Sequence, residues 1–185
     1  MDDALDLAPL AARLPTDLPF TTAAARAVGV DRSGLERMLR AGSVRRLFRG
    51  VYAAAGLPES VEVRATAVRL ACAREAVAVD RTAAWVHGVD PVGAAALPLD
   101  LVAPPGPGRR AGAGVRRLTP RDVQVIAGLC VTTPLRTALD VGRLSREDHA
   151  LATMDALLSG PTFGHVDLLA ELPRMAGLAG VGQLR

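Results

Sequence analysis

The stretch SGLERMLRAGSVRRLFRGVYAA, residues 33–54, decides the fold of the first part of the chain. It contains five arginines and a single acidic residue, Glu36, and another arginine, Arg32, stands directly before it. Like charges repel, so this arrangement costs folding free energy unless a negative partner is nearby. The stretch therefore indicates a surface that faces a polyanion.

Apolar residues within this stretch recur at helical spacing. Leu35, Met38 and Leu39 would form the buried side of a helix. Asp31 or Ser33 can cap the start of this helix, because both side chains accept hydrogen bonds from free backbone amides. A helix is therefore predicted over the first half of the stretch.

A shorter helix is predicted just before this one. Thr21 or Thr22 can cap it, and Gly29 can end it. Only the segment GVDRS, in which Val30 is expected to be buried, separates the two helices. This spacing is typical of a helix-turn-helix.

The residues after the second helix change to a β pattern. Two β-prone segments flank Arg49 and Gly50, and a two-residue connection that ends in glycine is compatible with a hairpin. Helix, helix and hairpin in this order predict a winged helix-turn-helix in residues 1–56. A further short helix is expected within residues 2–14, with its start at Pro9.

Residues 57–185 have a different pattern, in which helices and strands alternate. Thr133 as cap and Pro134 at the first helical position mark the beginning of one helix. The sequence therefore predicts an α+β fold, with a winged helix-turn-helix followed by a mixed α/β domain. In this second domain, the expected helices are 60–75, 81–88, 134–144, 146–160 and 163–177, and the expected strands are 76–79, 97–103, 114–119 and 123–133.

The composition limits the classes of protein that remain. Half of the 185 residues are apolar but only 3% are aromatic, so leucine, valine and alanine must form the core. No apolar run is long enough for a membrane span, and the acidic start, MDDALDL, is unlike a signal peptide. Cys72 and Cys130 share no motif spacing, and we expect two separate thiols in a reducing cytoplasm, without contact to a membrane.

The net charge of +3 hides a strong segregation of charge. Residues 32–49 and residues 109–121 each carry +5, so the rest of the chain sums to −7. Segregation of this kind is typical of nucleic-acid-binding surfaces. The second cluster lies on and after a loop rich in glycine and proline, where it could extend a DNA footprint, bind RNA or an acidic protein, or only solvate the loop. Its members are Arg109, Arg110, Arg116, Arg117 and Arg121.

The first cluster predicts contacts with double-stranded DNA. With the apolar side of the helix turned inward, Ser33, Arg37 and Arg40 share the outward face that a recognition helix presents to the major groove. The hairpin arginines are placed for contact with phosphates or the minor groove, although one of them could instead pair with an acid of the first helix. The candidate DNA-binding residues are Arg32, Ser33, Arg37, Arg40, Arg45, Arg46 and Arg49.

The sequence contains no recognisable catalytic or cofactor motif. His87, His149 and His165 are scattered, without the spacing of metal ligands. The glycine-rich loop PGPGRRAGAG lacks the lysine and the hydroxyl residue that hold a nucleotide. We therefore expect neither an enzyme nor a bound metal or cofactor.

Three short motifs resemble the AbiEi antitoxin family, in the same order along the chain. They are Arg-Gly-Val-Tyr at 49–52, Ala-Ala-x-x-His-Gly at 83–88, and threonine, arginine, threonine and aspartate at 133, 136, 137 and 140. The resemblance extends over nearly the whole chain, and it implies a type IV toxin–antitoxin system of abortive infection, which defends bacteria against phage.

The resemblance also implies a division of roles. The N-terminal winged helix of this family binds promoter DNA and represses its own operon. The C-terminal domain opposes a nucleotidyltransferase-like toxin without necessarily touching it. Many actinobacterial relatives carry a further nuclease-like domain, so an alternative is that this chain is the DNA-targeting first part of a larger nuclease-like protein.

The motif residues of the second half are expected to serve the fold. Arg136 and Asp140 are four apart on one helix and can pair on its surface, with Thr133 as the cap of that helix. Trp85 is expected in the core, and His87 is expected to form a hydrogen bond near a helix end.

Overall fold

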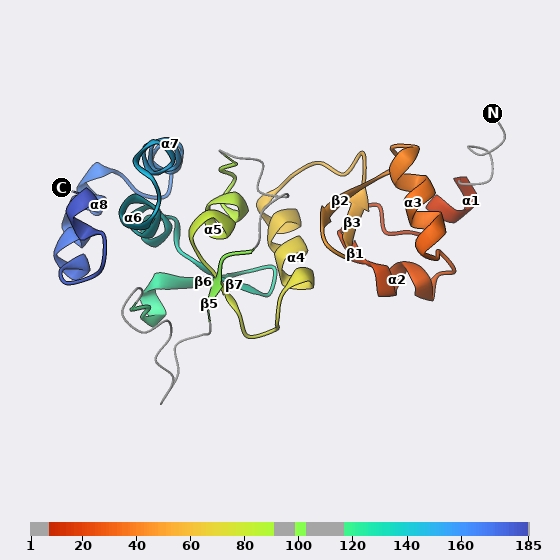
Figure 1. The fold of residues 1–185 in the computed structure, drawn as a ribbon, viewed down its shortest axis with the longest axis horizontal. Coiled ribbons are helices and arrows are strands. Elements are labelled where there is room, and N and C mark those ends of the chain that lie inside the picture. The colour runs from red at the N-terminus through yellow and green to blue at the C-terminus, as the bar shows by residue number, and fades with distance from the viewer. Residues whose placement is uncertain (1–7, 91–98, 103–116, 185) are drawn as a thin grey trace. The chain divides into compact units, whose positions relative to one another are not determined.

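A computed structural model of the protein describes residues 8–90, 99–102 and 117–184 (Figure 1). The chain divides into two compact units, Met1–Cys72 and Ala73–Arg185, which we call unit 1 and unit 2. Both units combine helices with strands, which confirms the predicted α+β class. None of the helices within the described ranges is long and apolar enough to cross a membrane.

Unit 1 has the element order of a winged helix-turn-helix, in which two helices are followed by a hairpin. Its elements are α1 (Ala8–Ala11), β1 (Phe20–Thr21), α2 (Thr22–Ala27), α3 (Arg32–Arg40), β2 (Val44–Phe48), β3 (Val51–Ala54) and α4 (Val61–Ala71). The three strands form one antiparallel sheet in the order β1-β3-β2. The hairpin of β2 and β3 is the expected wing.

The boundaries of the two central helices follow from local hydrogen bonds. The Thr21 side chain accepts a hydrogen bond from the amide of Ala24 at 3.1 Å and caps α2. The Asp31 carboxylate accepts one from the amide of Gly34 at 2.8 Å and caps α3. The sequence allowed Thr21 or Thr22 as the cap of α2 and Asp31 or Ser33 as the cap of α3, and these bonds identify Thr21 and Asp31. Gly29, with a φ of +86°, ends α2 as predicted.

The core of unit 1 is built on the inward side of α3. Leu35 and Met38 are buried together with Phe20, Val30 and Val44 in one apolar cluster. Full burial of an aliphatic side chain of this size contributes about 1.5–3 kcal/mol to stability. This buried stripe fixes the rotation of α3, so the polar residues of the helix lie on its opposite side.

Helix α4 belongs to unit 1, although the sequence suggested a domain boundary before it, near residue 57. Ser60 accepts a hydrogen bond from the amide of Val63 at 3.2 Å and caps the helix. The helix packs against all three strands of the sheet, and Val63, Ala67 and Val68 are among its buried residues. A boundary at residue 57 would separate α4 from this sheet.

Unit 2 combines a four-stranded sheet with several helices. Its elements are β4 (Val77–Ala78), α5 (Asp80–Val86), β5 (Leu101–Val102), β6 (Val123–Ile126), β7 (Leu129–Thr132), α6 (Pro134–Leu144), α7 (Glu147–Leu158), α8 (His165–Glu171) and the 3-10 helices η2 (Pro120–Asp122), η3 (Leu172–Met175) and η4 (Val181–Leu184). The strand order is β5-β4-β7-β6, in which only the β4–β7 pair is parallel. Helix α6 is central, since it packs against α5, α7, α8 and η4.

Two strand predictions for unit 2 differ from the structure. The single strand expected over 123–133 is a hairpin, because Ala127 and Gly128 have φ values of 47° and 77° and turn the chain back. Two positive φ values are typical of a tight hairpin turn, which favours asparagine or glycine at the place where this chain has alanine. The strand expected over 114–119 lies partly outside the described residues, and residues 117–119 are not in a strand.

Candidate nucleic-acid interface

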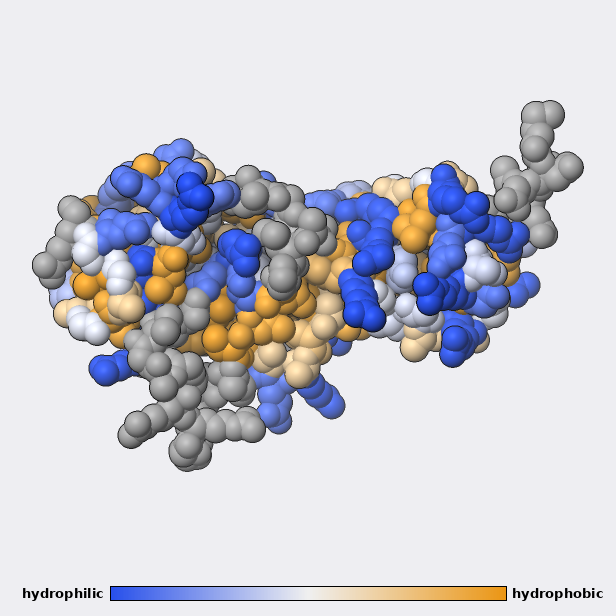
Figure 2. Space-filling view, in the orientation of Figure 1, coloured by the Kyte–Doolittle hydropathy of each residue, from blue (hydrophilic) through white to orange (hydrophobic). Residues whose placement is uncertain are grey.

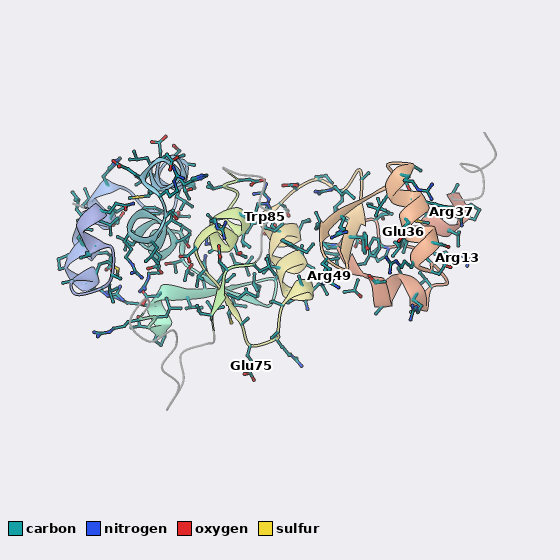
Figure 3. The ribbon with its side chains drawn as sticks, in the orientation of Figure 1. Arg13, Glu36, Arg37, Arg49, Glu75 and Trp85 are labelled. Carbon is teal, nitrogen blue, oxygen red and sulfur yellow. The ribbon has the colours of Figure 1, made fainter. Side chains whose placement is uncertain are left out.

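The polar side of α3 carries the predicted recognition residues. Arg32, Ser33 and Arg40 are exposed, and Arg37 is half-buried. Hydrophilic residues gather over this helix in Figure 2, and Figure 3 labels Arg37 and Glu36 on it. Glu36 is the only acidic residue within α3, so the helix keeps a net positive charge.

Local contacts order the beginning of this face. The Arg32 Nε atom lies 2.9 Å from a carboxylate oxygen of Glu36, so Glu36 neutralises one arginine. Both side chains are exposed, and a pair of this kind contributes little to stability. The Ser33 hydroxyl donates a hydrogen bond to the Asp31 carboxylate at 3.0 Å. The amide of Gly34, and then this hydroxyl, lower the pKa of Asp31, so the cap of α3 stays ionised at neutral pH.

Arg40 keeps most of its guanidinium available on the exposed face. Within the described part of the chain, its one hydrogen bond is a long one of 3.4 Å, from Nε to the carbonyl of Glu36. The two Nη groups are therefore in a position to bind a base edge or a phosphate.

The three hairpin arginines are not equivalent, because Arg45 is engaged inside unit 1. Its Nη1 atom lies 2.8 Å from Glu59, and its Nη2 atom donates to the carbonyl of Leu57 at 3.2 Å. Glu59 also accepts a hydrogen bond from Arg64 of α4 at 2.9 Å. Arg64, and then Arg45, lower the pKa of Glu59. One hairpin arginine is thus paired, as the sequence allowed, but its partner precedes α4 instead of belonging to the first helix.

Arg46 and Arg49 are exposed on the hairpin, and neither forms an ion pair with any residue that the structure describes. Arg49 and Gly50 make the tip between β2 and β3, and Figure 3 labels Arg49 there. Gly50 has a φ of +78°, and its carbonyl accepts a hydrogen bond from the amide of Thr22 at 3.0 Å. The first residue of α2 thereby holds the tip of the hairpin.

The sequence interpretation did not include Arg13 and Arg26, two exposed arginines at or beside the helix-turn-helix of unit 1. The Arg13 Nη1 atom lies 3.4 Å from the position that a Cβ atom would take at Gly29. Its guanidinium is therefore at the turn between α2 and α3 (Figure 3). Arg26 lies in the last turn of α2. Each is isolated in the sequence, and only the fold brings Arg13 to the helix-turn-helix.

Only part of the second basic cluster falls within the described residues. Arg109, Arg110 and Arg116 lie outside them. The Arg117 side chain is exposed, and Arg121 is paired with Glu171 at an N–O distance of 3.2 Å. The role of this cluster stays a prediction.

Trp85 and His87 occupy structural positions in unit 2. Trp85, labelled in Figure 3, lies in α5 and is 3% exposed. The His87 Nε2 atom is 2.7 Å from the carbonyl oxygen of Thr132, which joins the end of α5 to β7. Burial lowers the pKa of His87, although this carbonyl acts in the opposite direction, so the imidazole is neutral at pH 7.

The predicted surface position of the Arg136–Asp140 pair is wrong, because both side chains are buried. Their exposed fractions are 2% and 0%, and Arg136 Nε lies 2.9 Å from the Asp140 carboxylate. Thr133 caps α6, as predicted, by accepting a hydrogen bond from the amide of Arg136 at 3.3 Å. The pair is buried because α5, α7 and η4 all pack against α6.

Further ion pairs extend this pair into a network. Asp140 also contacts Arg143 at 2.7 Å, and Arg136 Nη1 lies 3.2 Å from Asp122. Asp122 is in turn 3.0 Å from Arg174. The network joins η2, α6 and η3, and removal of one member would leave a buried charge without its partner, at a cost of about 3–5 kcal/mol.

Within residues 8–90, 99–102 and 117–184, no group of three or more histidine, cysteine, aspartate or glutamate side chains is arranged to hold a metal ion. In unit 1, the exposed arginines of α3 and of the hairpin form a basic surface. Its exposed guanidinium groups match the geometry of phosphates and of guanine edges.

Two protein-family models match the chain, in N- to C-terminal order. Residues 19–55 match the model described as transcriptional regulator, AbiEi antitoxin. Residues 75–180, more than half of the chain, match the AbiEi antitoxin C-terminal domain. The first range contains α2, α3 and the hairpin, the second contains the sheet and most helices of unit 2, and α4 lies between them. No curated protein matches the chain in sequence.

Proposed function

The chain belongs to the AbiEi antitoxin family, and we propose that its unit 1 binds double-stranded DNA at the operator of its own operon and represses transcription there. The observation that carries this proposal is the asymmetry of α3. The helix buries Leu35 and Met38 and presents its arginines outward with a single acidic residue among them. A helix of this charge pattern binds phosphates and, within a groove, base edges.

In the proposed complex, α3 enters the major groove. Ser33, Arg37 and Arg40 contact base edges or the phosphates beside them. Arg46 and Arg49 reach the backbone next to the groove, because they are exposed on the hairpin that follows α3. Arg45 is not part of this proposed interface, because it is paired with Glu59 inside unit 1.

We further propose that unit 2 supplies the antitoxin activity, and that its functional partner is a nucleotidyltransferase-like toxin. The match of residues 75–180 to the antitoxin C-terminal domain supports this assignment. Direct binding between the two proteins is not required, since an antitoxin can reverse the effect of a toxin without a complex.

The test measures repression and antitoxin activity separately. A reporter gene behind the chain's own promoter measures repression, and the growth of cells that also express a nucleotidyltransferase-like toxin from the same operon measures antitoxin activity. We expect Arg46→Gln combined with Arg49→Gln to relieve repression and to leave toxin suppression intact. Arg69→Gln, at an exposed position of α4, is the matched control.

Each half of the proposal has its own contradicting result. Full repression by the double variant would exclude the hairpin from the DNA interface. Growth arrest that the wild-type chain fails to relieve would exclude the assigned toxin class while leaving the DNA-binding role untouched.

A further inference from the structure

Strand β6 forms one edge of the four-stranded sheet of unit 2. It pairs with β7 on one side, and none of the described residues forms a strand on its other side. An edge strand of this kind offers backbone N–H and C=O groups to a further strand, and it is usually protected by a charged side chain, a proline or a bulge. The sequence of β6 is Val-Gln-Val-Ile and its register with β7 is regular, so β6 has none of these protections.

Local hydrogen bonds establish which backbone groups of β6 face outward. The carbonyl of Asp122 accepts a hydrogen bond from the amide of Thr133 at 2.9 Å, so it is directed toward the β7 side. The next amide, that of Val123, turns away and donates to the carbonyl of Pro120. Because the direction of these groups alternates along an antiparallel strand, the amide and the carbonyl of Val125 both point away from β7. Neither group has a hydrogen-bond partner among the residues that the structure describes.

The side chain at this position is exposed as well. Val125 is 68% exposed, although it is the last member of an apolar row. In the register of the sheet, Val125 lies opposite Cys130, and Cys130 lies opposite Val77, so the three side chains share one face. Val77 is buried in the small apolar cluster of this face, and Cys130 packs against that cluster. The row therefore begins in the core of unit 2 and ends uncovered at the edge of the sheet.

We propose that β6 pairs with β6 of a second copy of this chain, antiparallel and about a two-fold axis beside Val125. The amide of each Val125 donates to the carbonyl of the other, so the outward groups of both copies are satisfied together. Residues directly opposite in an antiparallel pair lie on the same face, and the two Val125 side chains therefore come into contact. The apolar rows of the two copies join across the axis, and their two sheets become one.

A second copy fits this edge better than a flexible peptide does. The edge is only four residues long, and a peptide that binds there would lose its conformational freedom for very few hydrogen bonds. In a second copy, β6 is already held in an extended conformation by β7. The strand is also uncharged, so two copies of it meet without local repulsion, although the whole chain carries a net charge of +3. Interfaces that bury less than about 1,200 Å² are weak, so the dimer should form only at high protein concentration.

Sedimentation velocity of the full chain measures this association, at concentrations from about 10 µM to about 1 mM. A reducing agent keeps the two free thiols, Cys72 and Cys130, from cross-linking the copies. We expect a shift from monomer to dimer and no larger species, because the two-fold pairing uses up the β6 edge of both copies. Hydrogen exchange of the Val125 amide, followed by NMR, should slow as the dimer forms.

Substitutions at Val125 test the edge directly, and its exposure allows the variants to fold. Val125→Lys should weaken dimerisation about tenfold or more, because it places two like charges opposite each other. Val166→Lys is the matched control, since Val166 is an 80% exposed valine of α8, outside the sheet. Val125→Pro removes the outward amide without removing a hydrogen bond to β7, and it should also weaken the dimer. Val125→Thr keeps this amide and a β-branched side chain, and it should dimerise as the wild-type chain does.

Several results would overturn the proposal. A chain that stays monomeric over the whole concentration range excludes the pairing, and growth into open-ended oligomers excludes its two-fold symmetry. Equal effects of Val125→Lys and Val166→Lys would show that added charge, and not the edge, governs association. Wild-type association of Val125→Pro, or equal losses in Val125→Pro and Val125→Thr, would exclude the reciprocal backbone bonds.

One further variant separates this dimer from the proposed DNA-binding surface. Arg46→Gln combined with Arg49→Gln should dimerise as the wild-type chain does, because the hairpin of unit 1 has no part in the β6 pairing. Loss of association in this double variant would assign the contact to unit 1. That result would overturn the β6 pairing and leave the DNA-binding proposal standing.

Discussion

Arginines that look alike in the sequence have three different environments in the structure. Arg45 fixes the hairpin through Glu59, and Arg136 is a buried member of a charge network. Arg40 keeps its Nη groups on the exposed face of α3. The partner and the burial of each arginine, and not its residue type, therefore decide which of them can meet DNA.

Single substitutions should separate base contacts from phosphate contacts. Arg40→Ala should weaken operator binding by about 1–3 kcal/mol and relax the sequence preference, because it would remove the proposed contact to a base edge. Arg46→Ala should weaken binding to operator and to unrelated DNA by the same factor, because phosphates carry no sequence information. Fluorescence anisotropy with both DNAs measures the effects, with Arg69→Ala as control. If each variant lost operator binding and binding to unrelated DNA by the same factor, α3 would not be the recognition helix.

At the level of helices and strands, short-range features were predictable and long-range ones were not. Thr21 and Asp31 cap their helices through amides only three residues away, so the sequence pattern contains the whole interaction. The pair of Arg45 and Glu59 connects a strand to the segment after the hairpin, and no local pattern indicates it. The burial of Arg136 depends on the packing of other helices against α6, and two of them, α5 and η4, lie far from it in the sequence, which is why the pair was expected on a surface.

Helix α4 extends the first unit beyond the hairpin. A fragment of residues 1–72 should unfold at a higher urea concentration than a fragment of residues 1–56, because the shorter chain leaves the sheet surface under α4 exposed to water. Circular dichroism in urea measures both midpoints. Equal midpoints would show that α4 adds nothing to the stability of unit 1.

The network between η2, α6 and η3 makes the stability of unit 2 depend on pH. Burial raises the pKa of Asp122, but hydrogen bonds from Thr119 and the charge of Arg136 outweigh burial and hold it below its ordinary value of 3.8. The folded state therefore binds the proton less readily than the unfolded chain. The stabilisation is fully present above about pH 4 and is lost as the pH falls through the folded-state pKa.

Asp122→Asn should remove this dependence. The variant should be less stable than the wild-type chain at pH 7, by about 3 kcal/mol, because Arg136 loses a buried partner. Between pH 5 and pH 3 it should lose less stability than the wild-type chain does. Urea unfolding at the three pH values checks both expectations, and parallel pH profiles for the two proteins would contradict the role given to Asp122.

For the whole molecule, the placement of charge predicts how DNA binding responds to salt. If the basic face of unit 1 meets about four to six phosphates, the logarithm of the binding constant should fall with the logarithm of salt concentration with a slope of about −4 to −5. Arg46→Ala should reduce the magnitude of this slope by about one. Titrations of operator DNA between low and moderate salt measure it. A flat response would remove the electrostatic basis of the DNA-binding proposal.

The hydrogen bond between the amide of Thr22 and the carbonyl of Gly50 has a mechanical consequence. Because this bond ties α2 to the tip of the hairpin, it restricts motion of the hairpin against the helix-turn-helix, and so restricts the spacing between their two sets of proposed DNA contacts. A DNA duplex whose grooves do not match this spacing has to deform, and the energy of that deformation depends on its base sequence. In the proposed complex, the protein therefore selects DNA also by its flexibility, at base pairs that no side chain contacts.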